Sequence, residues 1–220
     1  MSEVIITVRG EHETRVAPER AVARISAVAD GPVRGTVVDR VSALSSPVRE
    51  DLTTRAEAGS VVEWSSGRVT VWSDRPWNAD GVQLDLVHHA SVELSATFGD
   101  PEALAEWLDT VAQRDGLQVG GVEWQLSPET RARIEREAAT RAVATAVERA
   151  TAYARAIGRS SVVPLEIADL GLLRGAEVDA TPRVFAKAAM EMDAAGSPGF
   201  AFRPEEIVVR AAVEARFRAE

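Results

Sequence analysis

The side chains of this 220-residue sequence that could do chemistry are three histidines and many carboxylates. The sequence contains no cysteine. Without cysteine, disulfides, thiolate catalysis and cysteine-ligated zinc sites are excluded. The histidines lie in two places, at His12 and at the adjacent pair His88 and His89. Any chemistry that uses imidazole must therefore be built at one of these places.

The first place is the stretch RGEHETRVAPERA, residues 9–21, in which His12 lies between Glu11 and Glu13. Successive residues of a strand point to opposite faces, so His12 does not share a face with these two glutamates. Glu19 lies beyond a proline turn, and nothing in the sequence forces it toward His12. The pattern favours an exposed strand end and a turn; a metal or acid–base site is the alternative.

The second place, His88 and His89, follows the same rule, because adjacent strand residues face opposite ways and at most one of them joins a given site. A metal site that used both would need a third ligand, for which periodicity offers Asp85 or Glu93. The favoured interpretation is a polar strand near a sheet edge. A metal site and a pH-responsive interface stay open as alternatives.

Motifs for nucleophilic catalysis and phosphate binding are missing from the sequence. There is no G-x-S-x-G elbow, and GRSS at 158–161 follows the end of an expected helix, where the dipole does not favour an anion. The short GPVRG and GLLRG stretches lack the Lys-Ser/Thr ending of a P-loop. We therefore predict no catalytic residue, no cofactor site, no metal site and no enzymatic activity.

Four of the five tryptophans are candidates for an interface or an apolar pocket. Trp64, Trp72 and Trp77 cluster within and just after one strand region, and Trp124 lies on a later strand. Trp64 and Trp72 are predicted to line one sheet face across an SSG turn, near His88. Core packing explains such residues most simply, but aromatics are also enriched at interfaces and in ligand pockets.

Composition restricts the partners that we expect. A net charge of −9 disfavours binding to nucleic acid, which usually needs a basic face. No apolar run approaches the roughly 20 residues of a membrane-spanning helix. The N-terminus MSEVIITVRG has no basic, then apolar, export signal, so we expect a cytoplasmic protein.

The elements expected in the first 126 residues are two strand–helix–strand units. Alternation predicts strands at 4–9 and 21–27, which we expect to be a hairpin or neighbours in one sheet. Apolar spacing predicts a helix over 37–52, kinked or restarted at Pro47, with Ser45 or Ser46 as the new N-cap. Strands around SSG complete the first unit, and a strand, a helix capped by Asp100 and another strand form the second. We place the units, as pseudo-repeats, at 3–75 and 82–127.

A long helix over 128–157 follows, capped by Ser127 and ended by Gly158, with a seam of alanines on one face. Beyond a further strand lies a loop at 172–203, and the chain closes with a strand at 206–218. The sequence thus predicts an α+β fold of antiparallel sheets with packed helices, in a single domain over 1–220.

This order of elements resembles the bacterial SIMPL-domain proteins. The resemblance is carried by ITVRGEHE, APERAVARISAVADG, HHASVELSATFGDPEALAEWLD, the stretch from VGGVEWQLSPET to the end of the long helix, and FRPEEIVVRAAVEARF. It implies an α+β fold, frequent oligomers, no established catalytic residues, export of many members to the cell envelope and links of some to stress responses. This chain departs from the pattern by lacking an export signal and by having His12 where a glycine is expected.

We therefore predict a non-enzymatic SIMPL-domain protein that self-associates as a homo-oligomer and is linked to stress response. The alternative is a small-ligand or metal-binding protein, with a hydrolase as one option, that uses His88 or His89 and the tryptophan-lined face.

Overall fold

The computed structural model describes residues 3–173 and 202–220 of the chain. It confirms an α+β fold with antiparallel sheets and packed helices. Contacts divide the described residues into two compact units, one of residues 3–17, 127–173 and 206–220 and the other of residues 18–126 and 202–205. Much of the predicted 172–203 loop lies outside the described residues.

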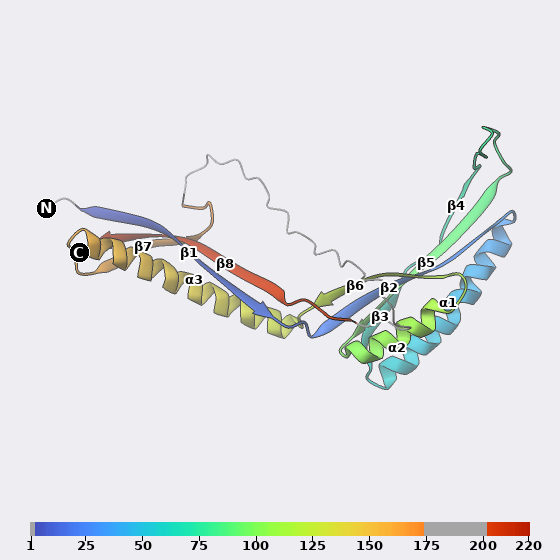
Figure 1. The fold of residues 1–220 in the computed structure, drawn as a ribbon, viewed down its shortest axis with the longest axis horizontal. Helices are drawn as coiled ribbons and strands as arrows, with labels where there is room; N and C mark the ends of the chain where they lie inside the picture. Colours follow the sequence, from blue (N-terminus) through green and yellow to red (C-terminus); the bar gives the residue numbers. More distant parts are fainter. Residues whose placement is uncertain (1–2, 174–201) are drawn as a thin grey trace. The chain divides into compact units, whose positions relative to one another are not determined.

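The first unit is a three-stranded antiparallel sheet packed against one long helix (Figure 1). Its strand order is β1-β8-β7, and β1 pairs with β8 along its whole length. The elements are β1 (Val4–Val16), α3 (Pro128–Ala156), β7 (Val162–Asp169) and β8 (Ile207–Ala219). The Ser127 side chain accepts a hydrogen bond from the Thr130 amide, so the predicted N-cap of α3 is confirmed.

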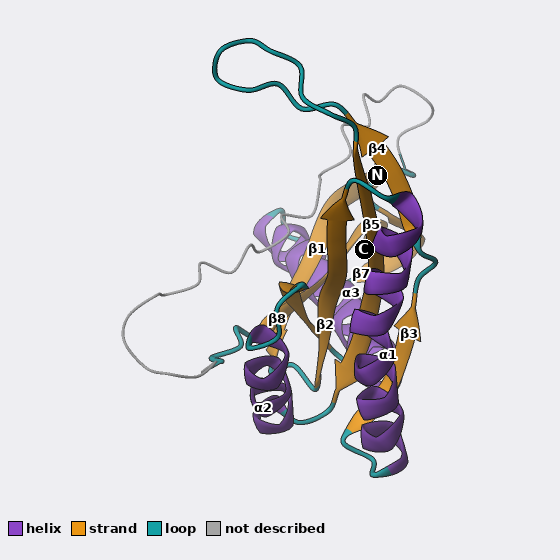
Figure 2. Ribbon diagram, turned by 90° about the vertical axis from the view of Figure 1, so that its right-hand side faces the viewer, coloured by secondary structure: helices purple, strands orange, loops and turns teal. Residues whose placement is uncertain are grey.

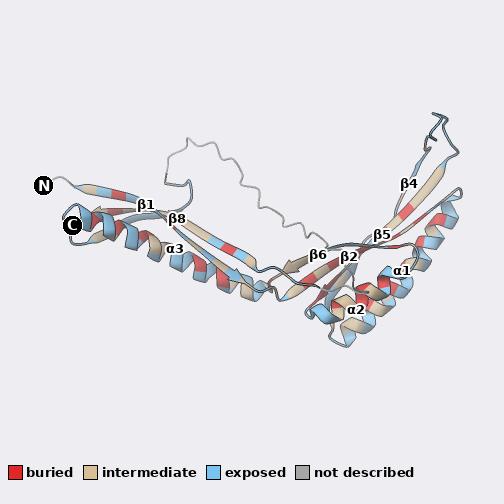
Figure 3. Cartoon of the chain, in the orientation of Figure 1, coloured by how far each residue is buried: buried red, intermediate tan, exposed pale blue. Residues whose placement is uncertain are grey.

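Alanines allow α3 to lie unusually close to this sheet. Every fourth residue of the helix is buried, as the repeated red bands of Figure 3 show. The buried set is Ile134, Ala138, Ala142, Ala146, Ala150 and Ala154. On the sheet side, β1 has Gly10 at the point of contact. A Cβ atom there would lie 2.0 Å from the carbonyl oxygen of Ala142 and 2.8 Å from the Ala146 Cβ. The approach therefore requires glycine in β1 and small side chains in α3.

The second unit is a sheet of order β3-β5-β2-β6, with β4 also paired to β5, and two helices. Its elements are β2 (Arg20–Gly31), α1 (Arg34–Glu57), β3 (Val61–Ser66), β4 (Thr70–Asp74), β5 (Val87–Phe98), α2 (Pro101–Ala112) and β6 (Leu117–Gln125). In the segment β2-α1-β3 the two strands are separated in the sheet by β5, and in the segment β5-α2-β6 they are separated by β2. This is the split β-α-β arrangement of ferredoxin-like folds. The two strand–helix–strand units are thereby confirmed.

Both helices of this second unit cover the same face of its sheet, as Figure 2 shows. Alternate residues of β2 and β5, from Ala21 to Ala29 and from Ala90 to Phe98, join the buried residues of α1 and α2 in one core. The other face carries His89, Ser91 and Glu93 on β5, and within the described residues neither α1 nor α2 covers it. Asp100 caps α2 by accepting from the Glu102 amide, as predicted.

One local prediction is wrong, and so is one alternative of a second. The first two strands are not a hairpin or sheet neighbours: β1 pairs with β8, whereas β2 has β5 on one edge and β6 on the other. Of the two alternatives predicted at Pro47, a kink or a restart, the restart with a new N-cap is wrong, because α1 continues from Arg34 to Glu57. Tertiary packing of its apolar stripe keeps α1 helical at Pro47, although proline has no N–H donor. The single domain and the pseudo-repeats at 3–75 and 82–127 stay predictions.

Replacing Gly10 with alanine should lower the free energy of unfolding by about 1–3 kcal/mol, because a methyl group would press on the α3 backbone. The matched control is Gly35→Ala, since an added Cβ at Gly35 meets nothing within 4 Å. Urea unfolding of both variants provides the measurement. Equal stability of Gly10→Ala and the wild-type protein would contradict the close approach.

Candidate functional site

The outer edge of the second unit's sheet carries the residues that the sequence singled out. β3 and β4 both pair with β5, one after the other, so the SSG stretch is not a hairpin turn. Ser66 faces Leu94; in unbroken register Thr70 would face Ala90, but it faces Ser91. One extra residue therefore lies between β3 and β4, as in a β-bulge.

This one-residue shift sends the two nearby tryptophans to opposite faces. Trp64 faces Ala96 and packs against the core under the helices. Trp72 faces His89 on the uncovered face and is 47% exposed. The prediction that Trp64 and Trp72 share a face is wrong, because eight residues preserve the face of a strand only when no bulge intervenes.

His89, rather than His88, is the histidine that contacts tryptophan. Its ring stacks on Trp72 with centroids 5.2 Å apart and planes at 14°. Its Nε2 lies 3.1 Å from Oδ1 of Asp74, and the strand register places Asp30 of β2 opposite it. Trp72, His89 and Asp30 therefore share one row of the sheet, and the Asp74 carboxylate reaches the imidazole from two positions further along β4.

His88 points to the other face, as the alternation of adjacent residues predicts. Its Nδ1 lies 2.6 Å from the Ser73 hydroxyl on β4, and its register partner on β2 is Gly31. Within residues 3–173 and 202–220, no three His, Asp or Glu side chains come together as a metal-binding group. The third ligand that the sequence suggested, Asp85 or Glu93, thus does not complete such a group with His88 or His89.

The other two candidate tryptophans lie away from this row. Trp77 is 67% exposed and forms an isolated bridge with Gln83 in the segment between β4 and β5. Trp124 on β6 faces Ala21, and its ring meets Phe202 edge-on at 5.8 Å. The four candidates therefore do not form one pocket or one continuous surface.

The glutamates around His12 are held by arginines. Glu13 accepts hydrogen bonds from Arg210 of β8 at 2.7 Å and from Arg15 at 3.3 Å. The Arg210 hydrogen bond is the main reason that the pKa of Glu13 is lowered from its ordinary value. His12 lies on the opposite face of β1, where its Nε2 is 3.1 Å from the Thr14 hydroxyl. His12 and its neighbouring glutamates are therefore separated, as alternation requires.

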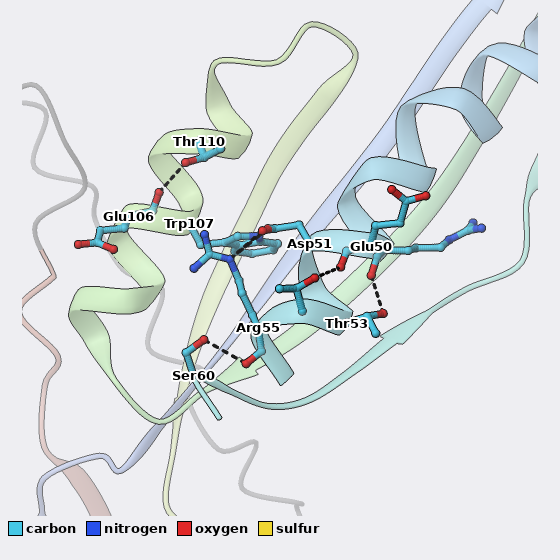
Figure 4. Close-up of polar contacts among 10 residues, drawn as sticks. Glu50, Asp51, Thr53, Arg55, Ser60, Glu106, Trp107 and Thr110 are labelled. Atoms are coloured by element: carbon cyan, nitrogen blue, oxygen red, sulfur yellow. Dashed lines mark hydrogen bonds and ion pairs between the residues drawn. The ribbon is translucent and has the colours of Figure 1, made fainter. Parts of the chain in front are cut away.

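A polar contact that the sequence did not reveal joins the two helices of the second unit (Figure 4). The indole N–H of Trp107, a fully buried residue of α2, donates to Oδ2 of Asp51 on α1 at 3.0 Å. Arg55 donates to both oxygens of the same carboxylate at 3.1 Å. Only the spacing of Asp51 and Arg55, four residues apart on one helix, was visible in the sequence. This contact orients α1 against α2.

Comparison with known proteins places this architecture in a family. A family model described as SIMPL, protein of unknown function (DUF541), matches residues 6–217. The chain therefore belongs to the SIMPL family, as the order of its elements indicated. No curated protein matches the chain. No helix in the described part of the chain has both the length and the apolar character needed to cross a membrane.

Replacing Asp51 with alanine should lower the free energy of unfolding by about 1–3 kcal/mol, because the buried Trp107 N–H would lose its acceptor. The loss should be smaller in a Trp107→Phe background, where no N–H needs a partner. Asp39→Ala, at an exposed position of the same helix, is the control. A double-mutant cycle by urea unfolding measures the coupling, and additive effects would contradict it.

Proposed function

We propose that this SIMPL-family chain is a non-enzymatic protein that self-associates through the edges of its sheets. The supporting observation is that strands at the sheet margins, including β1, β7, β4 and β6, have one edge with no strand partner among the described residues. Unpaired N–H and C=O groups on such an edge are a template for pairing with another chain.

Exposed apolar side chains on these marginal strands add support. Ile5 of β1 and Ile167 of β7 are 55% and 50% exposed, and Trp72 of β4 is also open to solvent. Edges that are meant to stay single usually carry lysine, proline or inward charges. β7 carries Pro164, whereas β1, β4 and β6 contain neither lysine nor proline.

A second proposal is that the chain binds a small ligand or a metal ion at His89, with hydrolysis as one option. Its support is the contact of His89 with Asp74 and Trp72. The metal content of purified protein separates this proposal from the first. A link to stress response and a cytoplasmic location stay predictions of the sequence alone.

Static light scattering coupled to gel filtration tests the first proposal. At micromolar concentration the full chain should elute with a mass that is a multiple of the monomer mass and that falls on dilution. A strictly monomeric mass over the whole concentration range would overturn the proposal.

A further inference from the structure

The free edge of β4 is a short pairing window with defined ends. Among the described strands, β4 pairs only with β5, so the backbone groups on its other side have no strand partner. Before β4 the bulge between Ser66 and Thr70 interrupts the edge, where the Gly67 amide bonds to the Glu93 carbonyl at 2.8 Å. After β4 comes Pro76, which has no amide hydrogen to donate. A partner strand can therefore pair in regular register only along Thr70–Asp74.

Trp72 is the middle residue of this window and is held in place before any partner arrives. Its ring stacks on His89, and the Asp74 carboxylate holds that imidazole from the same strand as Trp72. One side of the indole is thereby covered and the rest remains open, at 47% exposure. A large aromatic side chain that is already ordered loses little conformational entropy on binding, which is typical of an interface anchor.

The window is complementary to itself when two copies pair antiparallel. With Trp72 opposite Trp72 of a second copy, Val71 faces Ser73 and Thr70 faces Asp74 across the new strand pair. In this register Arg68, which lies in the bulge just before the window, faces Pro76 of the other copy, and Asp74 of that copy is its diagonal neighbour, within reach of a long side chain. No ion pair involves Arg68 within the described residues, so its charge is available for this contact.

We propose that β4 is the contact between two copies of this chain, paired antiparallel about a two-fold axis at Trp72. The sheet of the second unit then continues into the sheet of the other copy. The row on the uncovered face runs from His89 through the two tryptophans to His89 of the other copy. Such an isologous contact uses the same patch twice, as the commonest homodimers do, and aromatic pairs are among the stabilising cross-strand neighbours of a sheet. This inference rests on the proposed self-association and adds the place, register and symmetry of the contact.

The test uses the full chain and measures the dissociation constant by sedimentation velocity. Trp72→Ser should weaken association by about tenfold or more, as expected for an aromatic anchor. Trp77→Ser is the matched control, because Trp77 is more exposed than Trp72 but lies outside the window, and it should leave association unchanged. Circular dichroism checks that each variant is folded.

A charge exchange tests the register. Arg68→Asp and Asp74→Arg should each weaken association several-fold, because each places like charges together across the axis. The double variant R68D/D74R restores an opposite-charge pair but not the Asp74–His89 contact, so it should bind more tightly than Asp74→Arg without reaching the wild-type affinity. A role of either residue in folding alone would not produce this recovery.

The possible results separate this inference from the function on which it rests. A monomeric wild-type protein overturns both. A wild-type protein that associates, with variants at Trp72, Arg68 and Asp74 that associate equally well, overturns the β4 contact and leaves self-association standing through another edge. Loss in the single variants without recovery in the double variant overturns the antiparallel register.

Discussion

The surface of the second unit depends on one extra residue between β3 and β4. Both strands pair with β5, and the shift between Ser66 and Thr70 decides which side chains enter the core. Because strand side chains alternate, a shift of one residue reverses the face of everything that follows. Trp64 therefore packs beneath the helices, whereas Trp72 is left on the open face beside His89. Without the bulge, Trp72 would face the helix side and the edge would lose its aromatic centre.

Local physics made most of the elements predictable from the sequence. Strand alternation, the four-residue spacing of α1 and α3, and the caps at Asp100 and Ser127 all describe neighbours in the chain, and the structure has them. Strand partners could not be predicted in the same way. β1 pairs with β8 from the far end of the sequence rather than with the adjacent β2, and alternation is identical for either choice. Periodicity shows which face of a strand is apolar, but it does not identify the strand beside it.

The candidate site shows the same limit at the level of single residues. Alternation correctly separated His12 from Glu13 and His88 from His89, because that argument needs only adjacent positions. The pairing of Trp72 with His89 depended on a bulge that no residue type in the SSG stretch specifies. The Asp51–Trp107 hydrogen bond joins residues of two helices that are 56 positions apart in the sequence, so neither sequence segment alone could reveal it.

Cysteine pairing across β4 tests the central claim most directly, because the chain contains no cysteine of its own. Two variants, Val71→Cys and Ser73→Cys, are oxidised separately and as a mixture. In the antiparallel register about Trp72, residue 71 of one copy lies opposite residue 73 of the other. The account predicts covalent dimers in the mixture and few in either variant alone. No cross-link in the mixture, or equal cross-linking in all three samples, would contradict it.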